Sequence, residues 1–111
     1  MRARIPVGLA TDNKPPDPWL AFRAACGRRD MITGAILGPA ERLSRLDALR
    51  ALTTYGAWFG FAERERGMLA PGKLADLAVF DQDPLTAPLE SLHEISCSLT
   101  MVGGRVIHSD G

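Results

Sequence analysis

Asp12 is a residue whose type and position could do chemistry. It follows an apolar run from Ile5 to Thr11 and precedes the pair Pro15-Pro16. Such a run, bounded by polar residues, is typical of a buried strand. A carboxylate at the end of a strand can ligate a divalent metal or take a proton from water. Aspartate also starts turns by bonding its own backbone, so from the residues alone both interpretations stay open.

The histidines and cysteines favour structural roles. His93 lies in a connector and His108 ends the last predicted strand, and the chain has no His-x-His pair. Cys26 and Cys97 lie on separate apolar patterns without Cys-x-x-Cys spacing. We therefore expect two solvated or hydrogen-bonded histidines and two buried free thiols, as in a reducing compartment.

Length and charge exclude several classes of protein. The 111 residues are too few for a complete (β/α)₈ barrel, which needs roughly 200. Because 13 Lys and Arg balance 13 Asp and Glu, no basic patch is predicted to attract a nucleic acid or a membrane surface. The basic start of the chain lacks a signal-peptide core, and no stretch is long enough to span a membrane. We expect a cytoplasmic protein.

The first half of the chain predicts one strand and two helices. After the Ile5–Thr11 strand, Asp17 is a natural N-cap and Pro18 suits the first helical position, so residues 19–26 should be helical. Met31–Arg42 contains Gly and Pro and is predicted to be a loop. Ser44 then caps a predicted helix. Apolar residues recur at helical spacing as far as Ala62, so the helix is predicted to end there.

The second half predicts three short strands. Leu74–Phe80 is an apolar run that ends in acidic residues and proline. Pro84–His93 is a connector with room for one helical turn. Ile95–Met101 alternates apolar and polar residues, as a half-buried strand does. Gly103-Gly104 signals a hairpin, and Arg105–His108 returns as its second strand.

Three segments carry a resemblance to a known family. They are Ala48–Ala57 (ALRALTTYGA), Gly67–Asp81 (GMLAPGKLADLAVFD) and Met101–Ile107 (MVGGRVI). Together they resemble the C-terminal end of the amidohydrolase superfamily of metal-dependent hydrolases. The branch that includes D-aminoacylase-like enzymes, which act on carbon–nitrogen bonds, is the nearer one. The resemblance covers about residues 5–108, and the Gly67–Asp81 run is its most specific part.

The resemblance implies a fold and a site. It implies an α/β fragment, in which residues 1–62 form the last strand–helix unit of an incomplete (β/α)₈ barrel and residues 63–111 form strands of a composite β-sandwich. Asp12 matches the metal-site aspartate at the end of the final barrel strand, as metal ligand and general base. The family cofactor is a divalent metal, with zinc the first candidate. One carboxylate is an incomplete site, so we expect this chain alone to hold none.

The resemblance also implies a function. The complete enzyme would hydrolyse non-peptide amide carbon–nitrogen bonds with metal-activated water, and we expect this chain alone to be inactive. The alternative is a non-catalytic structural or self-associating module derived from an amidohydrolase. Because a lone strand–helix unit exposes a sheet edge, we expect self-association or a partner chain to cover that edge, and neither a nucleic acid nor a membrane as partner.

Overall fold

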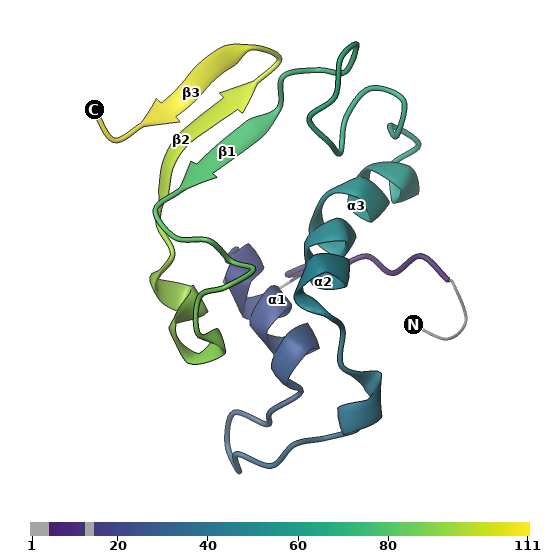
Figure 1. Ribbon diagram of the computed structural model, residues 1–111, viewed down its shortest axis with the longest axis vertical. Helices are drawn as coiled ribbons and strands as arrows, with labels where there is room; N and C mark the ends of the chain where they lie inside the picture. Colours follow the sequence, from purple (N-terminus) through teal and green to yellow (C-terminus); the bar gives the residue numbers. More distant parts are fainter. Residues whose placement is uncertain (1–4, 13–14) are drawn as a thin grey trace.

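Helices gather at one end of the molecule and a small sheet at the other (Figure 1). The computed structural model describes residues 5–12 and 15–111. In chain order the elements are α1 (Pro18–Gly27), the 3₁₀-helix η1 (Pro39–Glu41), α2 (Arg45–Leu52), α3 (Thr54–Phe59), β1 (Leu77–Phe80), the 3₁₀-helix η2 (Leu89–Glu94), β2 (Cys97–Val102) and β3 (Arg105–Ser109). None of the described helices is long and apolar enough to cross a membrane.

Helix α1 begins and ends as its sequence predicts. The Asp17 carboxylate accepts a hydrogen bond from the Trp19 N–H at 2.9 Å, and Pro18 occupies the first turn. The helix ends where Arg28 adopts a left-handed φ of 54° and donates its N–H to the Ala24 carbonyl at 2.9 Å. At each end of the helix, a local hydrogen bond therefore pairs a backbone group that the helix itself leaves without a partner.

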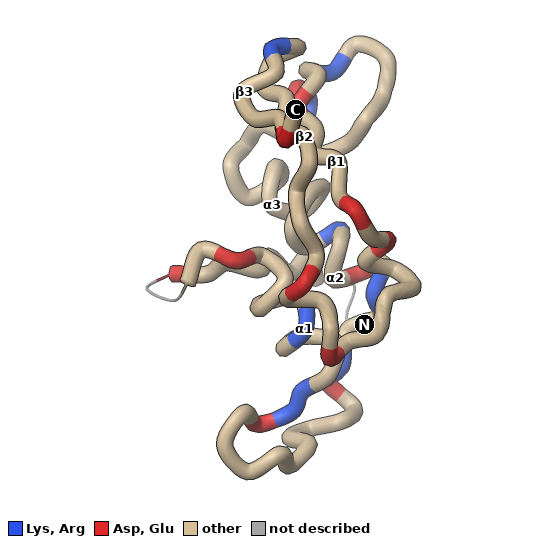
Figure 2. The backbone as a smooth tube through the Cα atoms, turned by 90° about the vertical axis from the view of Figure 1, so that its left-hand side faces the viewer, with Lys and Arg blue, Asp and Glu red and all other residues tan. Residues whose placement is uncertain are grey.

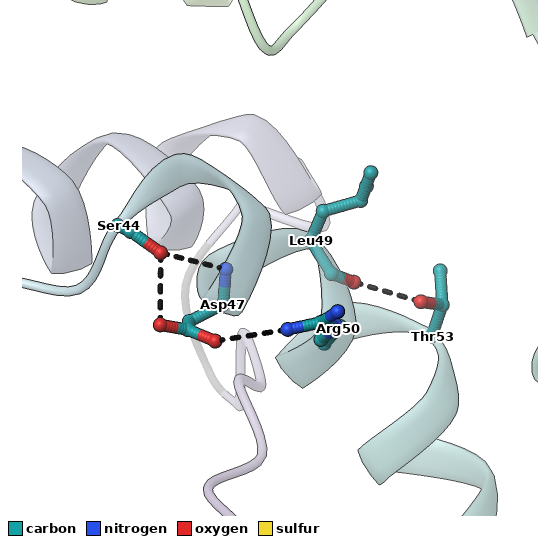
Figure 3. A network of polar contacts seen from close by, with 5 residues as sticks. All are labelled: Ser44, Asp47, Leu49, Arg50 and Thr53. Carbon is teal, nitrogen blue, oxygen red and sulfur yellow. Dashed lines mark hydrogen bonds and ion pairs between the residues drawn. The ribbon is translucent and has the colours of Figure 1, made fainter. Parts of the chain in front are cut away.

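The predicted single helix from Ser44 to Ala62 is wrong, because the structure breaks it into α2 and α3 at Thr53. The Ser44 cap is confirmed: its hydroxyl accepts from the Asp47 N–H at 3.1 Å (Figure 3). At the break, the Thr53 hydroxyl donates to the Leu49 carbonyl at 2.8 Å, and Thr53 has non-helical angles of −119° and −85°. A threonine hydroxyl that bonds the preceding turn bends helices, and Gly56 follows with low helix propensity.

The predicted strand over Ile5–Thr11 is also wrong. The segment is irregular and runs beside α2 and α3 (Figure 1), where the Leu9 N–H donates to the Ala51 carbonyl at 3.3 Å. A Cβ on Gly8 would lie 3.0 Å from the Phe59 ring, so the approach is close. A strand requires a neighbouring strand to pair with, and the described residues place helices beside this segment. The predicted turn that follows includes Asn13 and Lys14, which lie outside the described residues.

The three C-terminal strands form an antiparallel sheet in the order β1-β2-β3. The predicted hairpin is confirmed: Gly103 and Gly104, with φ of 55° and 80°, join β2 to β3. These left-handed angles are those that favour glycine in a two-residue hairpin turn. The sequence predicted that β2 would bury one face and expose the other. This is not seen: five of its six residues are partly exposed, and they lie on both faces of the strand. β3 is exposed throughout.

The core lies among α1, α2 and the segment around η2, away from the sheet. Its buried members are Trp19, Phe22, Cys26, Ala48, Ala87, Leu92 and Ile95. One ring of β1 reaches this core, since Phe80 meets Trp19 edge-on with 4.9 Å between ring centroids. The observed architecture is therefore a mixed α/β chain. The barrel unit, the sandwich and the division at residue 62 remain predictions.

Candidate functional site

Asp12 lies in a turn at the end of the N-terminal segment and is exposed. Its φ is 46°, in the left-handed region that aspartate tolerates better than most residues. The preceding residues hold it in place: Leu9 bonds Ala51 on α2, and Gly8 packs against Phe59 on α3. The carboxylate is thus presented to solvent from a segment anchored on the two helices.

The described residues do not fit a bound metal. Within residues 5–12 and 15–111, no three His, Cys, Asp or Glu side chains gather closely enough to hold an ion. A structural or catalytic zinc site needs at least three protein ligands. Asp12 therefore offers one carboxylate, which can accept a hydrogen bond or a proton but does not make a metal site.

The two histidines lie on other elements. His93 is on η2, with its Nε2 atom 3.9 Å from the Glu94 carboxylate. His108 is on β3, where Nε2 lies 3.3 Å from the Asp110 carboxylate and 3.1 Å from the Cys97 carbonyl. Both rings are exposed and have polar neighbours, as expected for solvated or hydrogen-bonded histidines.

Both cysteines are free thiols, and one of them, Cys26, is buried. Burial raises the pKa of Cys26, and the nearby Arg45 charge opposes that rise only in part. Cys97 is partly buried, and its Sγ lies 3.2 Å from the Leu99 carbonyl. The prediction of buried free thiols is confirmed for Cys26, whereas Cys97 keeps some exposure. A neutral buried thiol is a poor nucleophile.

The Gly67–Asp81 run has a structural role that the sequence analysis did not identify. Asp76 accepts a hydrogen bond from the Gly103 N–H at 2.8 Å and lies 3.7 Å from Arg66 Nε. Its carboxylate thus fastens the β2–β3 hairpin turn to the loop before β1. Lys73 donates to the Glu63 carbonyl. Asp76 and Gly103 are 27 residues apart in the sequence. No local sequence pattern could therefore have predicted this contact.

The sequence model of the Amidohydrolase family matches residues 1–108. An N-substituted formamide deformylase of Arthrobacter pascens is 34% identical over 108 residues, covering 92% of this chain and 19% of the deformylase. A putative amidohydrolase of Bacillus subtilis (strain 168), YtcJ, is 27% identical over 97 residues, covering 86% and 18% respectively. The chain spans less than a fifth of the length of these relatives.

The crystal structure of an amidohydrolase from Thermotoga maritima MSB8 shares the fold. It superposes with a TM-score of 0.66 at 20% identity, and the match covers 97% of this chain and 24% of that one. The helices and the sheet therefore keep an arrangement found within a larger amidohydrolase. With the family match over nearly every residue, this chain belongs to the amidohydrolase family.

Proposed function

We propose that this chain supplies the C-terminal part of a metal-dependent amidohydrolase that hydrolyses a non-peptide amide carbon–nitrogen bond. In this proposal residues 1–62 close the barrel of the complete enzyme, and residues 63–111 contribute strands to a small sandwich. By itself the chain has no hydrolase activity. The name of the Arthrobacter pascens relative, an N-substituted formamide deformylase, supports the choice of a carbon–nitrogen bond.

The observation that carries the proposal is the presentation of Asp12. Its carboxylate is exposed at the end of an apolar segment. None of the described strands pairs with that segment. In barrel enzymes catalytic groups lie at the C-terminal ends of the strands. In this proposal Asp12, exposed at the end of its anchored segment, is the group that this chain would place at that end of the barrel.

In the complete fold Asp12 would be one of several ligands to a divalent metal, which increases the acidity of bound water in such enzymes. The remaining ligands would have to come from outside the described residues. The Asp12 carboxylate would also accept the proton that the attacking water loses, the usual task of a general base. Zinc is the metal that we would test first.

A chimera tests the role of Asp12. The segment of the Arthrobacter pascens deformylase that aligns with this chain is replaced by this chain, and hydrolysis of an N-substituted formamide is measured. We expect the chimera to be active and Asp12→Asn to lower kcat by about 10²-fold or more, the usual contribution of acid–base catalysis. Glu63→Gln, which changes an exposed carboxylate after α3, is the control and should keep full activity.

The metal content of the same proteins gives a second readout. We expect the chimera to bind zinc and the isolated chain to bind none. Full activity in the Asp12→Asn chimera would overturn the catalytic role of Asp12. Stoichiometric zinc in the isolated chain would overturn the expectation that this chain alone holds no metal.

A second candidate function is a non-catalytic, self-associating module. The observation that favours it is the exposure of many large apolar side chains, among them Ile32 at 95%, Phe61 at 94% and Leu69 at 72%. Apolar surface of this extent is normally covered by a partner or a second copy. Analytical ultracentrifugation distinguishes the candidates: a discrete dimer that persists on dilution supports the module, and a monomer contradicts it.

A further inference from the structure

A cavity lies between α1, η2 and the loop that follows α1. Its volume is about 360 Å³, within the range of roughly 300–1,000 Å³ typical of small-molecule sites. Its apolar lining includes Leu20 and Ala24 of α1 and Leu89 of η2. Cys26 also lines it, and because burial raises the pKa of its thiol, this side chain stays neutral.

Three arginines border this cavity: Arg23 from α1, and Arg29 and Arg42 from the loop. Figure 2 shows basic positions along α1 and at the start of the loop below it. Arg29 Nη1 donates to the Gly34 carbonyl at 2.7 Å, and Arg42 Nε donates to the Gly27 carbonyl at 3.2 Å. Each of these bonds occupies one of five guanidinium N–H donors, so both side chains retain donors for a ligand.

Two carboxylates also line the cavity, Asp30 and Glu90. Asp30 Oδ1 accepts from the Ile32 N–H at 2.8 Å and from the Thr33 N–H at 2.6 Å. These bonds lower its pKa and keep it ionised, but they commit that oxygen to the loop. The cavity lining therefore holds three arginines and two carboxylates, so its formal charge is positive.

The loop is ordered in advance of any ligand. The Asp30 N–H donates to the Ala35 carbonyl at 2.8 Å, the Leu37 N–H donates to the Arg28 carbonyl at 2.8 Å, and Arg29 forms a bridge with Ile36. Met31, which is 83% exposed, also lines the cavity. A site that is already ordered loses less entropy when a ligand binds.

We propose that this cavity binds a small organic carboxylate with a short apolar tail. Guanidinium groups match the geometry of a carboxylate and hold it with paired hydrogen bonds. The tail would lie against Leu20, Ala24 and Leu89. The site lies on elements other than the segment that carries Asp12, so it goes beyond the proposed hydrolase function and does not depend on it.

Calorimetric titration of the purified chain with hexanoate tests the proposal. Neutral hexanamide and inorganic phosphate are titrated in parallel. We expect saturable binding of hexanoate that weakens as salt is added, and at least about fivefold weaker binding of both comparison compounds. Equal binding of phosphate would overturn the need for the tail, and equal binding of hexanamide would overturn the need for the charge.

Matched variants locate the site. Arg42→Gln and Arg23→Gln should each weaken hexanoate binding by about fivefold or more, as expected when a charged hydrogen-bond donor is lost at a partly exposed site. Arg105→Gln, on the exposed strand β3, is the control and should bind as the unaltered chain does. Circular dichroism confirms that each variant is folded. No saturable binding, or the same affinity in Arg42→Gln, Arg23→Gln and Arg105→Gln, would overturn the proposal.

Discussion

The helical region and the sheet of this molecule keep their shape by different means. Phe22 on α1 and Leu92 on η2 are fully buried, whereas Val106 and Ile107 on β3 are 53% and 63% exposed. The helical region therefore has a hydrophobic core of its own. The sheet depends on its backbone ladder and on polar contacts such as that of Asp76 with Gly103.

This difference agrees with the proposed place of the chain in a larger enzyme. A three-stranded sheet with apolar side chains exposed on both faces is typical of a sheet that packs against another sheet or against helices in a larger fold. The matched Thermotoga maritima amidohydrolase has about four times as much chain in which such a cover could be found. We therefore expect substitutions to have large effects in the helical region and small ones on the sheet.

The largest effect is expected at Phe22. Phe22→Ala removes a fully buried ring from the core and should lower the free energy of unfolding by about 3–5 kcal/mol. Phe61→Ala, at a side chain 94% exposed, should change it by less than about 0.5 kcal/mol. Urea unfolding followed by circular dichroism measures both. Similar losses in the two variants would contradict the placement of the core.

Leu92 tests whether η2 belongs to the helical core although it lies between β1 and β2 in sequence. Leu92→Ala should cost about 2–4 kcal/mol, because the side chain is fully buried against α1. Leu69→Ala, at a residue 72% exposed, is the matched control and should be nearly neutral. If Leu92→Ala is also neutral in urea unfolding, η2 contributes little to the core.

Gly67 tests the junction between the helices and the loop that leads to the sheet. Its φ is +98°, and an added Cβ would lie 2.7 Å from the Ala57 Cβ. Gly67→Ala combines a strained backbone with a clash and should cost about 2–3 kcal/mol. Gly72→Ala has a similar φ of +87° but meets open space, so it should cost only about 1 kcal/mol. Thermal unfolding that ranks Gly72→Ala as the more damaging change would contradict this account.

Local signals in the sequence predicted local structure well. Asp17, Ser44 and the Gly103-Gly104 pair each act within three or four residues, and all three features are confirmed. The break at Thr53 could not be predicted from apolar spacing, since that pattern continues through it. It depends on a side-chain hydrogen bond to Leu49 that competes with the helix.

Non-local features could not be predicted in the same way. The Ile5–Thr11 pattern is that of a buried strand, but a strand forms only where another strand pairs with it. The position of Asp12 followed from the family resemblance, and its exposure in a turn is a result of the structure. In the proposed function, the other ligands would come from outside the described residues. The cavity beside α1 combines residues from three separate elements and has no sequence motif.

The smallest effect is expected from pH at the loop after α1. Hydrogen bonds from the Thr33 and Ile32 N–H groups lower the pKa of Asp30 from its ordinary 3.8. A lowered pKa means that the ionised form stabilises the folded loop above the ordinary pKa and that this contribution disappears as pH falls through the lowered value. Protection of the Ile32 and Thr33 amides from hydrogen exchange should therefore fall below about pH 4. Amides of β2 that donate to backbone carbonyls should keep their protection over this range, since those partners do not titrate. Equal loss in both places would mean that acid unfolds the whole chain and that Asp30 has no separate local role.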